Sequence, residues 1–228
     1  MKSLKVIEEN KDWIVIDKPH GIIVEKNPFE SPTVEEWLES YFEINSKKKY
    51  IGIVHRIDKA TSGVMIVAKK KSVLKLLNEQ FANRAVQKSY LAIVDKMPPE
   101  KRGNLNHYLF KDQKNKKAII FEKSIKNTKP AILQYEHLAS HNGMHLLQLN
   151  PKTGRFHQIR AQLGYIGCPI LGDKKYGNEN TYYDQSIALH AFKLTIDDLY
   201  VEKKISFKAS LPNNKFWKEF SIIIGTLP

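Results

Sequence analysis

The feature that most limits how this chain can fold is a series of short strand-like runs. Several of these runs follow one another with no helix between them. They are rich in β-branched, aromatic and other apolar residues and lie at Trp13–Ile16, Ser89–Val94, Ala118–Phe121, Ile132–Tyr135, Met144–Leu149, Ile187–Ile196 and Ile205–Ala209. Parallel neighbours would need a long crossover, usually a helix, between consecutive strands. The pattern therefore predicts an α+β fold on a mixed, largely antiparallel β-sheet with flanking helices, and not a parallel doubly wound sheet.

Four segments carry helical signals. Apolar residues recur at helical spacing over 72–83, and Ser31-Pro32 places a proline at the start of another helix. The apolar face of that helix is expected to hold Val34, Trp37, Leu38 and Tyr41. Helices are also expected over 156–166 and 216–220. The basic run Lys111–Lys117 predicts a projecting hairpin or loop, and Ser46–Tyr50 predicts a loop.

The composition narrows the partner and the compartment. The chain has 228 residues, 42% of them apolar, which suffices for one domain or two closely joined subdomains. Lys and Arg outnumber Asp and Glu by 37 to 24, and this net charge of +13 favours a nucleic-acid partner, because neutralised phosphates release counterions. The single cysteine, Cys168, excludes an internal disulfide, the N-terminus is too polar for a signal peptide, and no apolar run would cross a bilayer. We therefore expect a cytoplasmic protein that binds no membrane.

The densest polar cluster in the first half runs from His55 to Gly63 and contains Asp58. Arg56 and Lys59 flank this aspartate, and positive neighbours favour the ionised carboxylate. An ionised, positioned carboxylate can act as a nucleophile or a base. The alternative is that Asp58 only caps a turn at Thr61-Ser62-Gly63, and composition alone favours that alternative.

A second cluster, Lys152–Arg160, combines a Thr-Gly turn with the expected start of a helix. Free N–H groups at a helix start can bind a phosphate. A helix that begins near Phe156 would place Phe156 and Arg160 on one face. The alternative is a cationic helix face in solvent, against which the absence of an acid from Pro151 to Gly172 is a mild argument.

Several motifs, in order along the chain, resemble those of the RluA family of pseudouridine synthases. They are His55-Arg56-Ile57-Asp58-Lys59-x-Thr61-Ser62-Gly63, Gln80-Phe81-x-x-Arg84-x-Val86-x-Lys88-x-Tyr90-x-Ala92, Thr153-Gly154-Arg155-x-His157-Gln158-Ile159-Arg160, a Gly-rich segment over 166–177, and Leu189-His190-Ala191. The resemblance spans Trp13 to Ile196. It implies the pseudouridine synthase fold with a central catalytic cleft, as one domain over residues 1–228 or two subdomains flanking that cleft.

The resemblance also implies the reaction, in which uridine in RNA becomes pseudouridine. The base leaves the sugar at N1, turns in the pocket and rejoins the sugar through C5, so the product is an isomer and no metal or redox cofactor is expected. The uridine must first leave its stack, at a cost of roughly a few kcal/mol that RNA contacts have to offset. The RNA class is ribosomal RNA, tRNA or both, and the protein is expected to work as a monomer.

The motif positions assign roles. Asp58 matches the essential carboxylate, Tyr90 the active-site tyrosine that lies against uracil, and Arg160 the arginine that pairs with the aspartate. The residues expected to contact RNA or shape the pocket are Arg56, Arg155, Thr61 and His157. Whether Asp58 attacks the base, attacks the sugar or removes a proton stays open.

Two departures and two rival functions accompany this interpretation. Ile57 replaces the commoner leucine, and Phe156 stands where the family often has threonine, which is expected to alter the pocket rim or a phosphate contact. No separate N-terminal S4 domain is expected before Trp13, so the RNA-binding candidates are Lys111–Lys117 and Lys69–Lys71. The rivals are a non-catalytic RNA-binding protein with the same fold, and a metal-assisted hydrolase that uses Asp17, Asp58, Asp173 and the histidines.

Overall fold

The computed structural model describes residues 4–44, 50–183 and 186–227. The chain forms two compact units, one of Met1–Lys88 with Ala191–Ser210 and one of Ser89–His190 with Leu211–Pro228. Among the described residues, no helix is long and apolar enough to cross a membrane. The loop expected at Ser46–Tyr50 lies, apart from Tyr50, outside the described residues.

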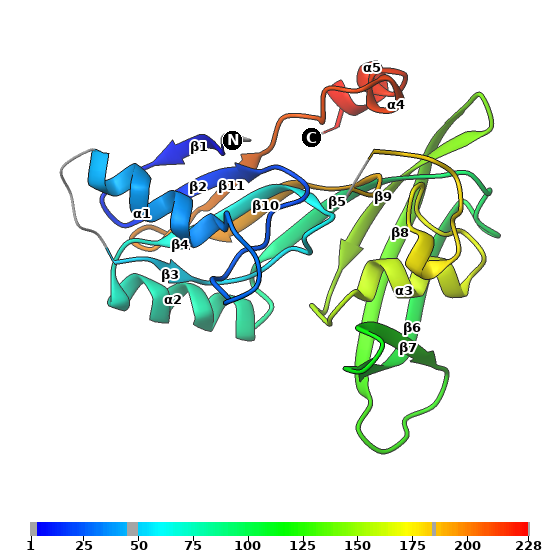
Figure 1. Ribbon diagram of the computed structural model, residues 1–228, viewed down its shortest axis with the longest axis horizontal. Coiled ribbons are helices and arrows are strands. Elements are labelled where there is room, and N and C mark those ends of the chain that lie inside the picture. The colour runs from blue at the N-terminus through cyan, green and yellow to red at the C-terminus, as the bar shows by residue number, and fades with distance from the viewer. Residues whose placement is uncertain (1–3, 45–49, 184–185, 228) are drawn as a thin grey trace. The chain divides into compact units, whose positions relative to one another are not determined.

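The first unit is built on β-strands, of which the pairs β1–β2, β2–β4, β3–β4 and β10–β11 are antiparallel (Figure 1). Its main strands lie in the order β1, β2, β4 and β10, with β3 paired to β4 and β11 paired to β10. Their bounds are β1 Lys5–Glu9, β2 Trp13–Lys18, β3 Gly52–Ile53, β4 Ser62–Ala68, β10 Leu189–Asp197 and β11 Lys204–Lys208. Every residue of β4 is buried, so this strand is the centre of the unit's core.

Two helices complete the first unit. Helix α1, Val34–Ile44, buries Val34, Leu38 and Phe42, and α2, Lys71–Ala82, packs on β3 and β4. Helix α1 begins at Val34 and not at the expected Ser31-Pro32. Thr33 fixes this start through a capping box, because its hydroxyl accepts from the Glu36 N–H at 3.1 Å while the Glu36 carboxylate accepts from the Thr33 N–H at 2.8 Å.

Gly63 lies at the start of β4 and cannot be replaced by a larger residue. Its φ of +119° is in the region that favours glycine. A Cβ atom at this position would lie 2.2 Å from the carbonyl oxygen of Ala191 in β10. The turn expected at Thr61-Ser62-Gly63 is thus wrong in its bounds, since Ser62 and Gly63 already belong to the strand. The close approach of β4 to β10 places the preceding turn, which contains Asp58, at the edge of the buried strand.

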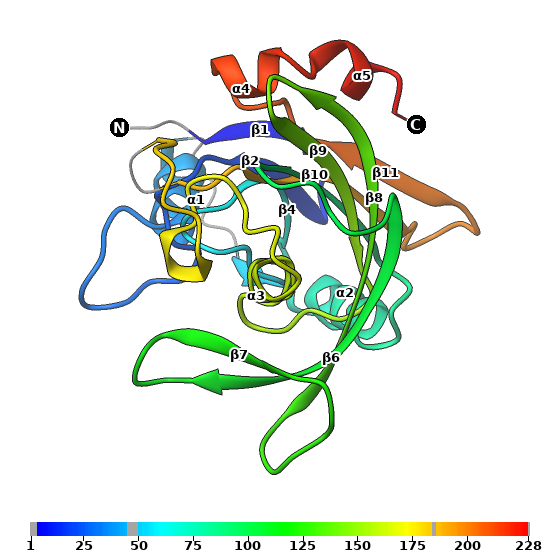
Figure 2. The same ribbon diagram turned by 90° about the vertical axis from the view of Figure 1, so that its right-hand side faces the viewer.

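The second unit contains five antiparallel strands, in the order β5, β9, β8, β6 and β7. The strands are β5 Gln87–Val94, β6 Arg102–Asp112, β7 Lys117–Phe121, β8 Lys129–His141 and β9 Met144–Pro151. Helix α3, Gln158–Tyr165, packs against β6, β7 and β8 on one face of this curved sheet (Figure 2). A 3-10 helix, η1 Lys174–Tyr176, and the short helices α4 Lys215–Lys218 and α5 Ser221–Gly225 complete the unit.

The predicted fold class is confirmed, and several element predictions are wrong. The sheet is largely antiparallel, as the pairs β1–β2, β2–β4, β5–β9, β6–β8 and β8–β9 show, and the helices are few. Strands β1 and β6 were not predicted, and α3 begins at Gln158, two residues after the expected start. Phe156 therefore does not share a helix face with Arg160. The projecting hairpin expected at Lys111–Lys117 is present as the turn between β6 and β7.

Candidate active site

Asp58 lies in a tight turn that leads directly into β4. Its backbone carbonyl accepts a hydrogen bond from the Thr61 N–H at 3.0 Å, and its side chain is half-buried. Ile57 before it is buried, whereas the side chain of Arg56 is 68% exposed. The turn fixes the backbone and leaves the carboxylate at the boundary between the core and solvent, where a carboxylate can meet a substrate.

Three contacts anchor this turn from outside. The carbonyl of Lys59 accepts from the Gly21 N–H at 2.7 Å. Lys18 is fully buried, and its ammonium group donates to the carbonyl of Ile22 at 2.8 Å and to the carbonyl of Lys59 at 3.5 Å. On the other side, His55 Nε2 accepts from the Ile66 N–H at 3.1 Å. The Asp58 turn is therefore held by both the β2 loop and β4.

The acceptor role of His55 requires a neutral ring. Its desolvation, together with the nearby Lys88, lowers its pKa to about 3, so Nε2 keeps its lone pair for the Ile66 N–H. The ring also stacks on that of Phe81, with the two ring centroids 4.9 Å apart. His55 is thus a structural residue of the turn.

Tyr90 and Thr61 occupy contrasting positions. Tyr90 is in β5, paired with Leu149 of β9, and its side chain is half-buried in the second unit. Thr61 belongs to the first unit and is only 2% exposed. Among the described residues its hydroxyl has no hydrogen-bond partner. This burial favours a scaffold role for Thr61 over a direct contact with RNA.

The residues before α3 are held by side-chain hydrogen bonds to β8. Thr153 Oγ1 accepts from the Ile132 N–H at 2.9 Å and donates to Gln158 Oε1 at 2.7 Å. Gln158 Oε1 also accepts from the Arg155 N–H at 3.0 Å. These bonds satisfy the backbone of the loop and end at His157, which has a left-handed φ of +51° and delays the helix start.

Arg160, in the first turn of α3, forms a buried bidentate ion pair with Asp173. Its Nε donates to Asp173 Oδ2 at 2.7 Å and its Nη2 to Oδ1 at 2.8 Å, and the two side chains are 8% and 1% exposed. A guanidinium has five N–H donors, and this pair uses two of them. The fork is therefore fixed in direction while further donors can bind a second acceptor.

A hydrogen-bonded chain continues from Arg160 through His157 and Tyr176. Arg160 Nη1 lies 3.0 Å from His157 Nε2, and His157 Nδ1 lies 2.9 Å from the Tyr176 hydroxyl. That hydroxyl accepts from the Ala118 N–H of β7 at 2.7 Å. Because a guanidinium only donates, Nε2 must be the acceptor and Nδ1 must carry the proton.

The surroundings of His157 agree with this neutral tautomer. Desolvation, followed by the positive charges of Arg160, Lys175 and Lys111, lowers its pKa to about 3. The ring of Tyr176 also lies 5.2 Å from the Arg160 guanidinium carbon. The second unit thus contains an arginine held by a carboxylate, an imidazole and an aromatic ring.

The comparison with protein families is decisive. Residues 12–165 match the family described as RNA pseudouridylate synthase. The chain belongs to this family. It is therefore an isomerase that acts on uridine in RNA, and the RluA-like resemblance of its motifs is confirmed.

Relatives and solved structures support the membership in this RNA pseudouridylate synthase family over nearly the whole chain. The ribosomal large subunit pseudouridine synthase D of Borreliella burgdorferi is 34% identical over 235 residues, covering 97% of this chain and 68% of that protein. An RNA pseudouridine synthase of Haemophilus influenzae is 30% identical, covering 94% of this chain and 91% of that one. The structure of human RNA pseudouridylate synthase domain containing 4 aligns with a TM-score of 0.79 at 25% identity, covering 98% of this chain and 94% of that chain.

Within this synthase, the structure distributes the predicted site residues over the two units. Asp58, Arg56 and Thr61 belong to the first unit, and Tyr90, Arg155, His157 and Arg160 belong to the second. The contacts inside each unit do not test the pairing of Arg160 with Asp58, which stays a prediction. The structure adds Asp173 and Tyr176 as partners of the Arg160 cluster. The motif resemblance covered both only as part of the Gly-rich segment over 166–177 and gave neither a role in the synthase site, although a buried arginine requires a carboxylate.

The structure also bears on what was expected of Phe156, of the lysine run and of Arg155. Phe156 packs against the core cluster of Leu109, Ala118, Ala131 and Ala161 and stacks on His157, so the residue that replaces threonine has a packing role. Lys69 is buried and pairs with Glu9, and Lys70 pairs with Asp12 at 2.7 Å. Lys69 is therefore wrong as part of an RNA-binding surface, whereas Lys70 and Lys71 are exposed and stay candidates. Arg155 donates its Nε to the Pro130 carbonyl at 3.0 Å.

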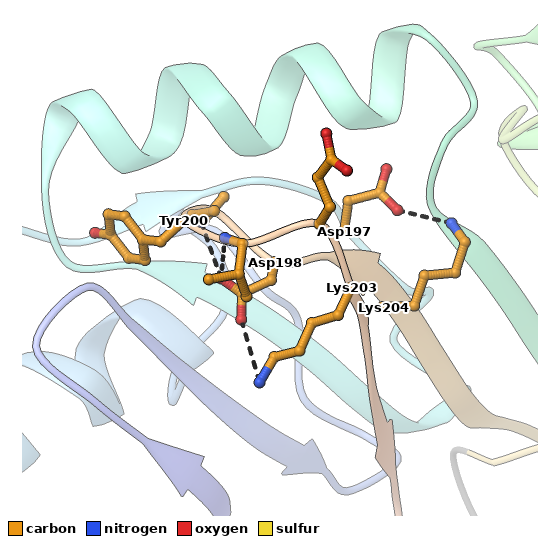
Figure 3. A pocket seen from close by; sticks show the side chains of 8 residues that line it. Asp197, Asp198, Tyr200, Lys203 and Lys204 are labelled. Carbon is orange, nitrogen blue, oxygen red and sulfur yellow. Dashed lines mark hydrogen bonds and ion pairs between the residues drawn. The ribbon is translucent and has the colours of Figure 1, made fainter.

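A shallow pocket at the loop between β10 and β11 contains none of the predicted site residues (Figure 3). It is lined by residues 197–204 of the first unit. Both of its aspartates have cationic partners in the same loop, Asp197 with Lys204 at 2.7 Å and Asp198 with Lys203 at 4.0 Å. We assign this pocket a structural role in closing the loop.

The neutral histidines predict a dependence of stability on pH. Both His55 and His157 have folded-state pKa values of about 3 against an ordinary value of 6.5, so the unfolded chain binds protons first. The free energy of unfolding should therefore fall as the pH drops below 6.5, by at most about 1.4 kcal/mol per pH unit for each histidine. Urea unfolding between about pH 7 and about pH 5, above most carboxylate titration, measures this slope.

A matched pair of variants assigns the pH effect. His157→Gln and His55→Gln should each reduce the dependence of the unfolding free energy on pH by the share of one histidine, and neither alone should abolish it. An identical slope in wild type and His157→Gln would contradict the neutral tautomer and its hydrogen bond to Arg160.

Proposed function

We propose that this synthase isomerises specific uridines in structured RNA, with Asp58 as its catalytic carboxylate. Tyr90 is proposed to lie against the extruded uracil, and Arg160 to hold the Asp58 carboxylate ionised and oriented. The support is that the family match covers residues 12–165 and so includes all three positions. Their coming together from the two units is part of the proposal.

The chemistry balances without a co-reactant. The bond between N1 of uracil and C1′ of ribose breaks, and a bond between C5 and C1′ forms. The proton on C5 leaves and N1 gains one, so nothing is oxidised or reduced. Asp58 supplies the carboxylate that this exchange needs, and the Tyr90 hydroxyl is proposed to help remove the C5 proton. Arg160, already fixed by Asp173, contributes a stabilising charge that needs no reorganisation.

The substrate is proposed to be ribosomal RNA, tRNA or both. Relatives in Borreliella burgdorferi and Rickettsia bellii are named large-subunit pseudouridine synthases D and C, and these names favour ribosomal RNA. The net charge of +13 suits a polyanion. We propose that the protein acts as a monomeric catalytic domain in the cytoplasm, without a cofactor.

The hairpin between β6 and β7 is the best-supported general RNA surface. Lys111, Lys114 and Lys116 are exposed on it, and Lys175 of η1 is tied to it by a hydrogen bond to the Lys116 carbonyl at 3.0 Å. These lysines lie in the same unit as Arg155 and the Arg160 cluster. Their charges would attract RNA at long range and hold its backbone.

Tritium release tests the proposed reaction directly. RNA transcribed with C5-tritiated uridine and incubated with the protein should release tritium to water, because the C5 proton is lost in every turnover. Ribosomal RNA and tRNA transcripts, compared side by side, identify the substrate class. An RNA-binding protein that lacks the activity would bind the transcripts and release none.

A further inference from the structure

The loop between β2 and α1 is drawn in blue in Figure 2. Two of its acids contact the basic residues that flank Asp58. Glu25 in this loop forms an ion pair with Arg56, and Glu30 forms one with Lys59 at 2.6 Å. All four side chains are at least 41% exposed. Exposed ion pairs of this kind are weak, so a stronger or more numerous set of anions can replace them.

Phe29 lies in the same loop, between the two acids, and its side chain is 91% exposed. The loop backbone around it is ordered by Asn27, whose Oδ1 accepts from the Phe29 N–H at 2.7 Å and from the Glu30 N–H at 3.0 Å. The Glu35 carboxylate of α1 fixes the other side through the Lys26 N–H at 2.7 Å. A large apolar ring is thus presented to solvent on a backbone that is held in place.

We propose that the loop of residues 25–31 is an RNA-binding element of the synthase, in which Phe29 stacks on an unpaired base near the target uridine. On binding, RNA phosphates take the place of the Glu25 and Glu30 carboxylates beside Arg56 and Lys59. The inference rests on the proposed function, because RNA supplies both the base and the phosphates.

Nucleic acid fits this surface better than a protein or a membrane. An aromatic ring beside exchangeable cations is the combination that binds single-stranded nucleic acid, with the ring stacking on a base and the cations holding the backbone. The guanidinium of Arg56 and the ammonium of Lys59 adjoin the turn that contains Asp58. The phosphates that flank an extruded uridine would lie there. The glutamates would hold these cations away from weaker anions until RNA arrives.

Phe29→Ala tests the stacking contact. The affinity for a fluorescein-labelled oligouridine, measured by anisotropy, should fall about 5- to 150-fold, the range for loss of one stacked base. Ile44→Ala is the matched control, since Ile44 is an apolar side chain 83% exposed at the end of α1. The control should bind like wild type, and equal affinity of Phe29→Ala and wild type would overturn the proposal.

Phe29→Trp and a charge-neutral loop give independent readouts. Phe29→Trp should retain the affinity and show fluorescence quenching on binding that exceeds that of wild type; tight binding with no added quenching would count against stacking. Glu25→Gln combined with Glu30→Gln should tighten binding severalfold, by up to about 10-fold, because the competing carboxylates are gone. Weaker binding by this double variant would contradict the exchange of anions.

The tritium assay separates this inference from the proposed function. If wild type isomerises uridine and Phe29→Ala binds and reacts like it, only the role of the loop is wrong. If wild type binds oligouridine through Phe29 but releases no tritium from any transcript, the loop assignment stands and the proposed reaction is wrong.

Discussion

Asp58→Asn should lower pseudouridine formation by at least about 10³-fold while leaving RNA affinity close to that of wild type. Asparagine keeps the size of the side chain and the turn bond from the Thr61 N–H to the backbone carbonyl of residue 58. It removes the charge that the proposed chemistry needs. Single-turnover tritium release with saturating protein measures the reaction step, and anisotropy measures binding.

Asp197→Asn is the control for this prediction. Asp197 is a half-buried aspartate of the same unit, paired with Lys204 in the loop between β10 and β11, outside the proposed site. It should react like wild type. If Asp58→Asn retained turnover, Asp58 would not be the catalytic carboxylate, and the family's reaction would have to use another group in this chain.

Arg160→Met should both destabilise the protein and abolish activity. Its removal leaves the Asp173 carboxylate, 1% exposed, buried without the guanidinium that binds it through two hydrogen bonds. Breaking a buried pair in this way costs about 3–5 kcal/mol, which corresponds to a fall in Tm of about 6–20 °C. Thermal unfolding followed by circular dichroism measures the loss.

The double variant Arg160→Met with Asp173→Leu separates the two roles of the arginine. Replacing both charges with apolar side chains should recover much of the stability lost in either single variant, because no buried charge is left unpaired. Activity should stay lost, since the guanidinium proposed to hold Asp58 is absent. A double variant that recovers both stability and turnover would show that Arg160 only maintains the structure.

Hydrophobic pattern predicted the parts of the fold that bury one continuous face. The buried β2 and the amphipathic α2 follow from such patterns. Strand β6 has alternating half-exposed residues, including Asn104 and Asn106, and gives no comparable signal. Its 11 residues are ordered by pairing with β8 and β7, which are contacts that a local pattern does not contain.

The starts of helices depended on single side-chain contacts. The capping box of Thr33 and Glu36 moved the start of α1 past the proline that seemed on sequence grounds to open it. The left-handed backbone of His157, stabilised by the bonds of Thr153 and Gln158, moved the start of α3 past Phe156. Backbone strain at a non-glycine residue is not encoded in local propensity, so no sequence pattern could have placed it.

The site itself was predicted by motif and not by composition. Position in a motif singled out Arg160, but it could not reveal that Asp173 would bind the guanidinium and that His157 would be neutral. Both follow from burial, which forces each charge or polar atom to find a partner. Lys69 shows the converse, because its place in a basic run suggested RNA binding and its burial against Glu9 excludes it.

The role proposed for Arg160 would have a consequence for which uridines can react. Asp173, His157 and Tyr176 set the direction of the guanidinium when the second unit folds, before any RNA is present. An electrostatic partner prepared in this way costs no rearrangement during the reaction, but it also cannot follow a base that arrives displaced by an ångström. Selection among uridines should therefore depend on whether the surrounding RNA can deliver its base to a fixed point, and rigid or strongly stacked sequences would be excluded by their own stiffness.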